Sequence, residues 1–165
     1  MDSKFLVRSL NTNDQSILWT MLMYAARESS LETVKANSEI ARYVLGWGRD
    51  GDLGVVVEHG KVAIGAAWVR LWSKGDHGYG YIADDIPELA IAVVPEARGK
   101  GVGTVLLLEA LALCQSQFSA VCLSTRTSNP ALRLYERTGF IRVSGSEVTN
   151  RTGGVSLTML YKFGM

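Results

Sequence analysis

A glycine-rich turn between a buried strand and a helix is the sequence feature that most limits what this chain can fold into. The continuous apolar run over residues 89–94 is typical of a central strand. Glycines at 99, 101 and 103 follow it and lead into an apolar helical segment, residues 102–113. Glycines let backbone N–H groups approach an anion, and the start of a helix adds unpaired donors and partial positive charge. The pattern predicts a phosphate-binding turn, although a tight strand-to-helix connection without a ligand also uses glycines.

Two familiar phosphate-binding motifs do not fit this turn. The Walker motif needs Ser or Thr after its Gly-Lys pair, and Lys100 is followed by Gly101. The dinucleotide-binding fingerprint needs a glycine three residues after its second one, and Thr104 occupies that position. The chain therefore has a glycine-rich turn of another kind, with the cations of Arg98 and Lys100 beside it.

Residue patterns along the rest of the chain predict a mixed α/β sheet in a single domain, residues 1–165. Alternating or continuous apolar runs predict strands over residues 5–8, 53–58, 61–72, 89–94, 120–125, 140–143 and 155–162. Capping residues and apolar spacing predict helices from the cluster at 11–14 through 25, and over 38–45, 102–113 and 131–138. The sequence contains no internal repeat or linker that would indicate a second domain.

Composition and charge exclude several classes of protein. Apolar residues make up 47% and charged residues 20% of the chain, so it can form a core of its own. The net charge of +1 lacks the basic excess of a general nucleic-acid binder. The start, Met1–Phe5, has no apolar region typical of a secretory signal, and the most apolar stretch, residues 102–114, is too short to cross a bilayer. We expect a cytoplasmic protein with no nucleic acid and no membrane among its partners.

Cysteines and histidines give no pattern typical of a disulfide framework or a metal site. Cys114 and Cys122 lie in apolar stretches and are expected to be buried free thiols. His59 and His77 lie far apart in the sequence, so we expect no metal cofactor. The sequence shows neither a plausible Cys–His pair nor a Gly-x-Ser-x-Gly motif, which argues against a covalent acyl-enzyme.

Two motifs, in this order, resemble those of the GCN5-related N-acetyltransferase (GNAT) family. The first is Arg-x-x-Gly-x-Gly after a buried strand, here Arg98, Gly101 and Gly103. The second comprises Asn129-Pro130-Ala131, Leu134-Tyr135-Glu136 and Gly139-Phe140. The resemblance extends from about Leu53 to Phe140. It implies an α/β (α+β) fold with a mixed, largely antiparallel seven-stranded sheet, about four flanking helices, and strands four and five splayed apart.

The resemblance also implies that acetyl-CoA lies in a V-shaped opening between strands four and five. Its pyrophosphate would lie on the backbone of Arg98, Gly99, Lys100, Gly101, Val102, Gly103 and Thr104. Backbone groups of Val93 and Val94 would pair with the pantetheine amides, as an extended peptide adds to a sheet edge. The Asn129 side chain would contact the pantetheine arm, although a helix N-cap alone also explains an asparagine at this position.

The same resemblance makes Tyr135 the general acid, with its hydroxyl facing the acetyl-CoA sulfur and protonating the departing thiolate. The alternative is a tyrosine that only packs on the core. An amine nucleophile must first lose a proton, because a lysine-type amine has a pKa of about 10.4. Glu88 matches the region where family members place a glutamate that works through a bound water. The alternative is a solvated acidic turn that also contains Asp84 and Asp85.

These residues predict an N-acetyltransferase that moves acetyl from acetyl-CoA to a primary amine by direct attack in a ternary complex. The acceptor could be a small-molecule amine or a protein N-terminus or lysine. Tyr79 and Tyr81 are candidates for a lid over it, whereas Trp68 and Trp72 are expected to pack on the sheet. The strands from Phe140 onward could pair across a homodimer. The alternative function is a non-catalytic acyl-CoA-binding or interaction module on the same fold.

Overall fold

A computed structural model describes residues 5–164, and the chain divides into two compact units. Unit 1 comprises Met1–Arg70 and Ala90–Leu113, and unit 2 comprises Leu71–Leu89 and Cys114–Met165. Each unit is built from two separate segments of the chain. The expectation of a single domain stays a prediction. The expectation drawn from Met1–Phe5, that the start lacks the pattern of a secretory signal, falls on residues of which the first four lie outside the described ones.

The strands of unit 1 lie in the order β1-β2-β3-β4. Their bounds are Phe5–Ser9 for β1, Leu53–His59 for β2, Val62–Arg70 for β3 and Glu88–Val93 for β4, of which the part from Ala90 belongs to this unit. Strands β1 and β3 both run antiparallel to β2. Gly60 and Lys61, which connect β2 to β3, have φ of 61° and 70°. Positive φ at both residues is typical of the type I′ turn, whose twist matches a hairpin.

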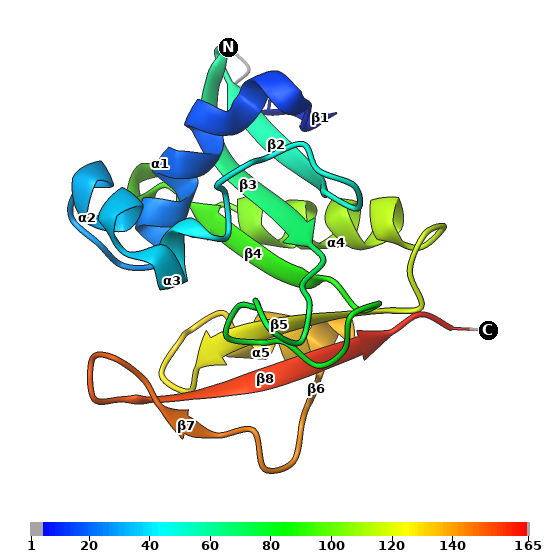
Figure 1. The fold of residues 1–165 in the computed structure, drawn as a ribbon. Helices are drawn as coiled ribbons and strands as arrows, with labels where there is room; N and C mark the ends of the chain where they lie inside the picture. The colour runs from blue at the N-terminus through cyan, green and yellow to red at the C-terminus, as the bar shows by residue number, and fades with distance from the viewer. Residues whose placement is uncertain (1–4, 165) are drawn as a thin grey trace. The chain divides into compact units, whose positions relative to one another are not determined.

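Helices cover both faces of the unit 1 strands (Figure 1). Their bounds are Gln15–Ala25 for α1, Leu31–Ala36 for α2, Ser38–Ala41 for α3 and Val102–Cys114 for α4, with short 3-10 helices at Thr12–Asp14 and Pro95–Ala97. On one face of β3, a Cβ added to Gly65 would lie 2.8 Å from Leu106, so α4 packs close to the strand. On the other face, the Trp68 indole donates to Tyr43 O after α3.

A buried ion pair fastens the loop before β2 to the end of β3. The Arg70 guanidinium donates to both carboxylate oxygens of Asp52 at 3.0 Å, and both side chains are 1% exposed. The remaining nitrogen of the fork, Nη1, donates to Arg42 O and Leu45 O at 2.8 and 2.7 Å. Every terminal group of this arginine therefore has an acceptor, which a buried guanidinium requires.

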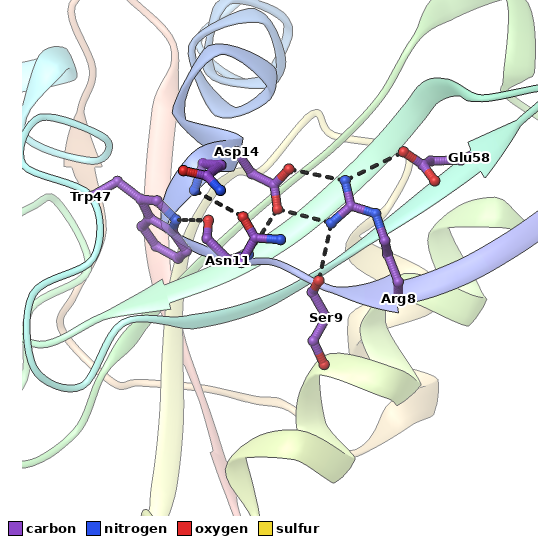
Figure 2. A network of polar contacts seen from close by, with 7 residues as sticks. Arg8, Ser9, Asn11, Asp14, Trp47 and Glu58 are labelled. Atoms are coloured by element: carbon purple, nitrogen blue, oxygen red, sulfur yellow. Dashed lines mark hydrogen bonds and ion pairs between the residues drawn. The ribbon is translucent and has the colours of Figure 1, made fainter.

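A second polar cluster holds the start of α1 against β1 and β2 (Figure 2). Arg8 donates to the two oxygens of Asp14 at 2.9 Å and to Glu58 at 3.3 Å. Asp14 also accepts from the backbone N–H of Asn11, whose side chain caps the same turn. The Trp47 indole donates to Asn11 O at 3.0 Å. The cluster is a reciprocal capping arrangement, which fixes where the helical segment begins.

Unit 2 is built on a long antiparallel pair, β5 and β8. The bounds are Ala120–Arg126 for β5, Leu132–Thr138 for α5, Ile141–Arg142 for β6, Val148–Thr149 for β7 and Val155–Lys162 for β8. Strands β6 and β7 both pair with β8. Glu88, the first residue of β4, belongs to this unit and pairs in parallel with Cys122 of β5.

The predicted fold class is confirmed: the structure is mixed α/β with a largely antiparallel sheet in which β4 and β5 are parallel. Residues 5–164 contain eight strands and five α-helices instead of seven and about four. The added strand, β7, has two residues and is defined by its pairing with β8. The added helix, α2, is capped by Ser30. The helix predicted over 38–45 ends at Ala41 and continues as turns to Gly46, whose φ of 75° ends the helical path.

Candidate functional site

The glycine-rich turn of unit 1 begins where β4 ends. Val94 N–H donates to Ile64 O of β3 at 2.9 Å, which fastens the last residue before the turn to the sheet. After the short helix at Pro95–Ala97, Arg98 is extended, and its Nε donates back to Val93 O at 3.0 Å. The strand end and the start of the turn are therefore held together by one backbone and one side-chain hydrogen bond.

Val93 and Val94, both predicted to pair with pantetheine, point their backbone N–H and C=O groups to opposite edges of the strand. Backbone groups of successive strand residues point to opposite edges, and Val94 N–H is bonded to β3. The backbone N–H and C=O of Val93 therefore point away from β3, with Val93 O also accepting from Arg98. Of the two residues, Val93 has the geometry to add an extended ligand at that edge.

Glycine is required in the turn for its backbone conformation. Gly99 and Gly101 have φ of 76° and 84°, in the left-handed region that other residues rarely adopt. A Cβ added at either position would meet no atom within 4 Å, so space is not the constraint. Both glycines and the intervening Lys100 are exposed. The turn therefore presents its backbone and a cation to an external ligand.

The first turn of α4 adds backbone donors to this exposed turn. Val105 N–H donates to Gly101 O at 3.2 Å, which opens the ladder of helical hydrogen bonds. The N–H groups of Val102, Gly103 and Thr104 precede that ladder and have no partner inside the helix. Together with the partial positive charge of a helix N-terminus, they fit a pyrophosphate.

Asn129 is held by its own loop in unit 2. Its Oδ1 accepts from Ala131 N–H at 2.8 Å, and its Nδ2 donates to Thr125 Oγ1 at 3.1 Å. This is an Asx turn, and α5 follows it at Leu132, one residue later than predicted. The cap-like role alone accounts for the asparagine, and its contact with the pantetheine arm stays a prediction.

Tyr135 combines a buried ring with an accessible hydroxyl. The residue is 5% exposed, and its ring packs against Phe140 with centroids 6.1 Å apart. Within residues 5–164 the Tyr135 hydroxyl has no hydrogen-bond partner. Every fully buried polar side-chain atom in these residues does have a partner, so the hydroxyl oxygen is not fully buried. The hydroxyl oxygen is therefore reached by solvent. Burial of the side chain raises the pKa of Tyr135 to about 12, so it is a neutral donor at pH 7.

Glu88 is buried and hydrogen bonded. It is 2% exposed, whereas Asp84 and Asp85 are exposed, so the solvated acidic turn contains the two aspartates without the glutamate. The Trp72 indole N–H donates to Oε1 of Glu88 at 2.8 Å. A carboxylate at a fixed position in a largely dry environment is a candidate proton acceptor.

The predicted lid residues lie in the connection between β3 and β4. Tyr79 is 53% exposed. The ring of Tyr81 stacks on His77 with centroids 4.4 Å apart, and its hydroxyl donates to Asp84, which raises the pKa of Tyr81. Tyr81 is therefore part of an ordered loop cluster, and a role over the acceptor stays a prediction for both tyrosines.

Other features bear on chemistry less directly. Cys114 and Cys122 are buried free thiols, as predicted, and burial raises the pKa of both, that of Cys114 to about 12. No cluster of three or more His, Cys, Asp or Glu side chains suited to a metal ion occurs in residues 5–164. Across the same residues, no helix is long and apolar enough to span a membrane.

The predicted site residues are distributed over both units. The glycine-rich turn and the two valines belong to unit 1, and Glu88, Asn129 and Tyr135 belong to unit 2. Sequence reasoning missed the bond from Trp72, which it expected only to pack, because an indole 16 positions from a glutamate leaves no local pattern. It also missed Gly80, where an added Cβ would lie 3.1 Å from Cδ of Glu88.

Comparisons with known proteins give a family match. A family model described as "Acetyltransferase (GNAT) family" matches residues 16–140, which include the turn, Glu88, Asn129 and Tyr135. No curated protein sequence matches the chain.

Solved structures resemble the chain over nearly its whole length. A ribosomal-protein-alanine N-acetyltransferase from Brucella melitensis is 20% identical, with 96% of this chain and 99% of that chain covered and a TM-score of 0.70. The ribosomal-protein-S18-alanine N-acetyltransferase from Escherichia coli is 20% identical, with 98% and 96% covered and a TM-score of 0.69. The structure of yncA from Salmonella typhimurium with its cofactor acetyl-CoA is 18% identical, with 99% and 96% covered and a TM-score of 0.73. At these identities the likeness establishes the shared fold.

Proposed function

The chain belongs to the acetyltransferase (GNAT) family, and we propose that it is an N-acetyltransferase that moves the acetyl group of acetyl-CoA to a primary amine. The observation that carries this proposal is the exposed turn with left-handed Gly99 and Gly101 before the unpaired N–H groups of α4. This is the arrangement that a pyrophosphate needs, and it lies within the family match.

The donor is held mainly by backbone groups. Residues 98–104 bind the pyrophosphate, with Lys100 adding a full positive charge at an exposed position. The outward-pointing N–H and C=O of Val93 pair with the pantetheine arm in the manner of an added strand. Because backbone donors need no side-chain reorganisation, this site is largely ordered before the donor binds.

The reaction is a direct attack within a ternary complex. Glu88, acting through a water, takes a proton from the ammonium form of the acceptor. The neutral nitrogen forms a bond to the thioester carbonyl carbon, the carbon–sulfur bond breaks, and the nitrogen gives its second proton to solvent, which leaves the amide and the CoA thiolate. The Tyr135 hydroxyl donates a hydrogen bond to the sulfur as its charge develops. The buried carboxylate and the accessible phenol hydroxyl support these two roles.

The acceptor is a primary amine on a small molecule or on a protein. Among the similar structures, two are named for ribosomal-protein alanine acetylation and another is named as a phosphinothricin N-acetyltransferase. Peptides with N-terminal alanine and small amino-acid-like amines are therefore the first acceptors to test.

A turnover assay with an amine panel tests the proposal. We expect CoA release that depends on the amine, with one acetylated product detected by mass spectrometry for each CoA formed. The panel should contain alanine-initiated peptides, lysine peptides, phosphinothricin, amino acids and polyamines. Tight acetyl-CoA binding without amine-dependent release across this panel would instead identify a non-catalytic acyl-CoA-binding module.

A further inference from the structure

Trp72 and Glu88 form a buried pair in unit 2 whose polar bond has no role in the reaction as described so far. Both side chains are almost fully buried, and the indole Nε1 lies 2.8 Å from Oε1 of the carboxylate. A hydrogen bond to an ionised acceptor is shorter and stronger than one to a neutral group. The carboxylate is also the form of this side chain that can accept a proton.

A buried indole N–H needs a hydrogen-bond acceptor, but that need alone does not explain why Trp72 is bonded to a carboxylate. Trp68 is fully buried, and its Nε1 donates to the backbone carbonyl of Tyr43 at 2.9 Å. A neutral carbonyl is therefore sufficient to pair a buried indole in this protein. Burying a carboxylate costs far more than burying a carbonyl, so the Trp72 bond to Glu88 has an energetic cost that packing alone does not explain.

The surroundings of Glu88 leave its carboxylate little freedom. Glu88 pairs with Cys122 of β5, and Cys122 N–H donates to Pro87 O at 3.0 Å, which holds the backbone just before Glu88. The α-carbon of Gly80 packs on the carboxyl group, since an added Cβ there would come within 3.1 Å of Cδ. With Oε1 bonded to the indole, rotation of the carboxylate is restricted.

We propose that Trp72 is the positioning residue for the base: its indole N–H fixes the carboxylate of Glu88 in the orientation in which it accepts the proton relayed from the acceptor amine. The proposal rests on the function proposed above. Trp72 does not touch the reacting atoms, and it acts only through the orientation of the carboxylate.

The test compares the same substitution at two tryptophans. Trp72→Phe keeps an aromatic ring and removes the N–H at Glu88, whereas Trp68→Phe removes an equivalent buried N–H from a backbone carbonyl. We expect Trp72→Phe to lower kcat about tenfold or more while KM for acetyl-CoA stays within about twofold, because general-base catalysis contributes about 100-fold or more. Trp68→Phe should change both constants less than about twofold. Trp72→Tyr keeps a large ring without a donor at Nε1 and replaces the phenylalanine variant if that protein does not fold.

A double variant shows whether the effect passes through the carboxylate. In a Glu88→Gln background the base is already lost, so adding Trp72→Phe should lower kcat by less than about twofold. If the two substitutions lowered kcat by independent factors that multiply in the double variant, the positioning role would be overturned and the role of Glu88 as base would stand. Equal kcat values for Trp72→Phe and Trp68→Phe would have the same meaning. An unchanged kcat in Glu88→Gln would overturn the base and its positioning residue while leaving acetyl transfer intact. Absence of amine-dependent release in the unmodified protein would overturn the proposed function together with this inference.

Discussion

Removal of one hydroxyl, in Tyr135→Phe, separates donor binding from catalysis. The ring is buried against Phe140, and the hydroxyl has no partner among the described residues. The variant therefore keeps the packing and loses no internal hydrogen bond. We expect its stability to change by less than about 1 kcal/mol.

The size of the catalytic effect follows from the raised pKa. Complete proton transfer from Tyr135, whose pKa is about 12, to a thiolate whose conjugate thiol has a pKa of about 8.5 is uphill by about 5 kcal/mol. The hydroxyl therefore acts as a hydrogen-bond donor to the developing sulfur charge, and the released thiolate takes its proton from solvent. A hydrogen bond to a charged group is worth about 1.5–3 kcal/mol, which corresponds to a fall in kcat of about 10- to 150-fold.

Steady-state kinetics and calorimetric acetyl-CoA titration measure the two effects separately. Tyr161→Phe is the matched control, because Tyr161 also packs on Phe140, with centroids 5.4 Å apart. We expect Tyr135→Phe to lower kcat while Kd for acetyl-CoA stays within about threefold, and Tyr161→Phe to leave both unchanged. Wild-type kcat should show no decline caused by Tyr135 ionisation up to about pH 10. Equal losses in kcat and in acetyl-CoA affinity would refute the reasoning.

Further predictions concern stability and thiol reactivity. Asp52→Asn leaves the buried guanidinium of Arg70 without a charge partner, so it should lower the free energy of unfolding by about 3–5 kcal/mol. Urea titrations measure this loss, and a loss under about 1 kcal/mol would contradict the buried ion pair. Arg8 donates to Asp14 and holds the pKa of that carboxyl below its ordinary value of 3.8. The ion pair therefore stabilises the folded protein above pH 3.8, and this stabilisation is lost as the pH falls through the lower pKa of Asp14 in the folded state. Asp14→Asn should remove this part of the acid sensitivity in urea titrations carried from about pH 5 to below the ordinary value of 3.8. Burial raises the pKa of Cys114 and Cys122, so a thiol reagent at pH 8 should label them only after unfolding; rapid labelling of the native protein would contradict the burial.

The parts of the fold that were predictable have a local signature. The strand over Val155–Lys162 has the predicted bounds, because its apolar pattern and the flanking glycines are readable from the sequence alone. The glycine-rich turn was predictable for the same reason, since Gly99 and Gly101 adopt the positive φ that their residue type allows. Strand β7 has no such signature, because two residues become a strand only by pairing with β8.

The parts of the site that were not predictable depend on contacts between distant residues. Only the family resemblance separated Glu88 from the neighbouring Asp84, and the contacts of its carboxyl group with Trp72 and Gly80 could not be read from the sequence. The hydrogen bond of Val94 to β3, which leaves Val93 as the outward-pointing residue, likewise requires the register of two strands. Helix α2 could have been found from its Ser30 cap, although only Val34 on it is buried.

The most direct measurement is thermal unfolding with and without acetyl-CoA for the wild type and a matched pair of glycine variants. Gly99→Ala and Gly145→Ala each place a methyl group at positive φ (76° and 78°) with no atom within 4 Å, so both should lose similar stability, about 1 kcal/mol. With acetyl-CoA at about 100 times Kd, linkage predicts about 2.7 kcal/mol of stabilisation, or a rise in Tm of about 5–10 °C, for the wild type and for Gly145→Ala. The account predicts a much smaller rise for Gly99→Ala. No rise for the wild type at millimolar acetyl-CoA, or equal rises for both variants, would contradict the claim that residues 98–104 bind the donor.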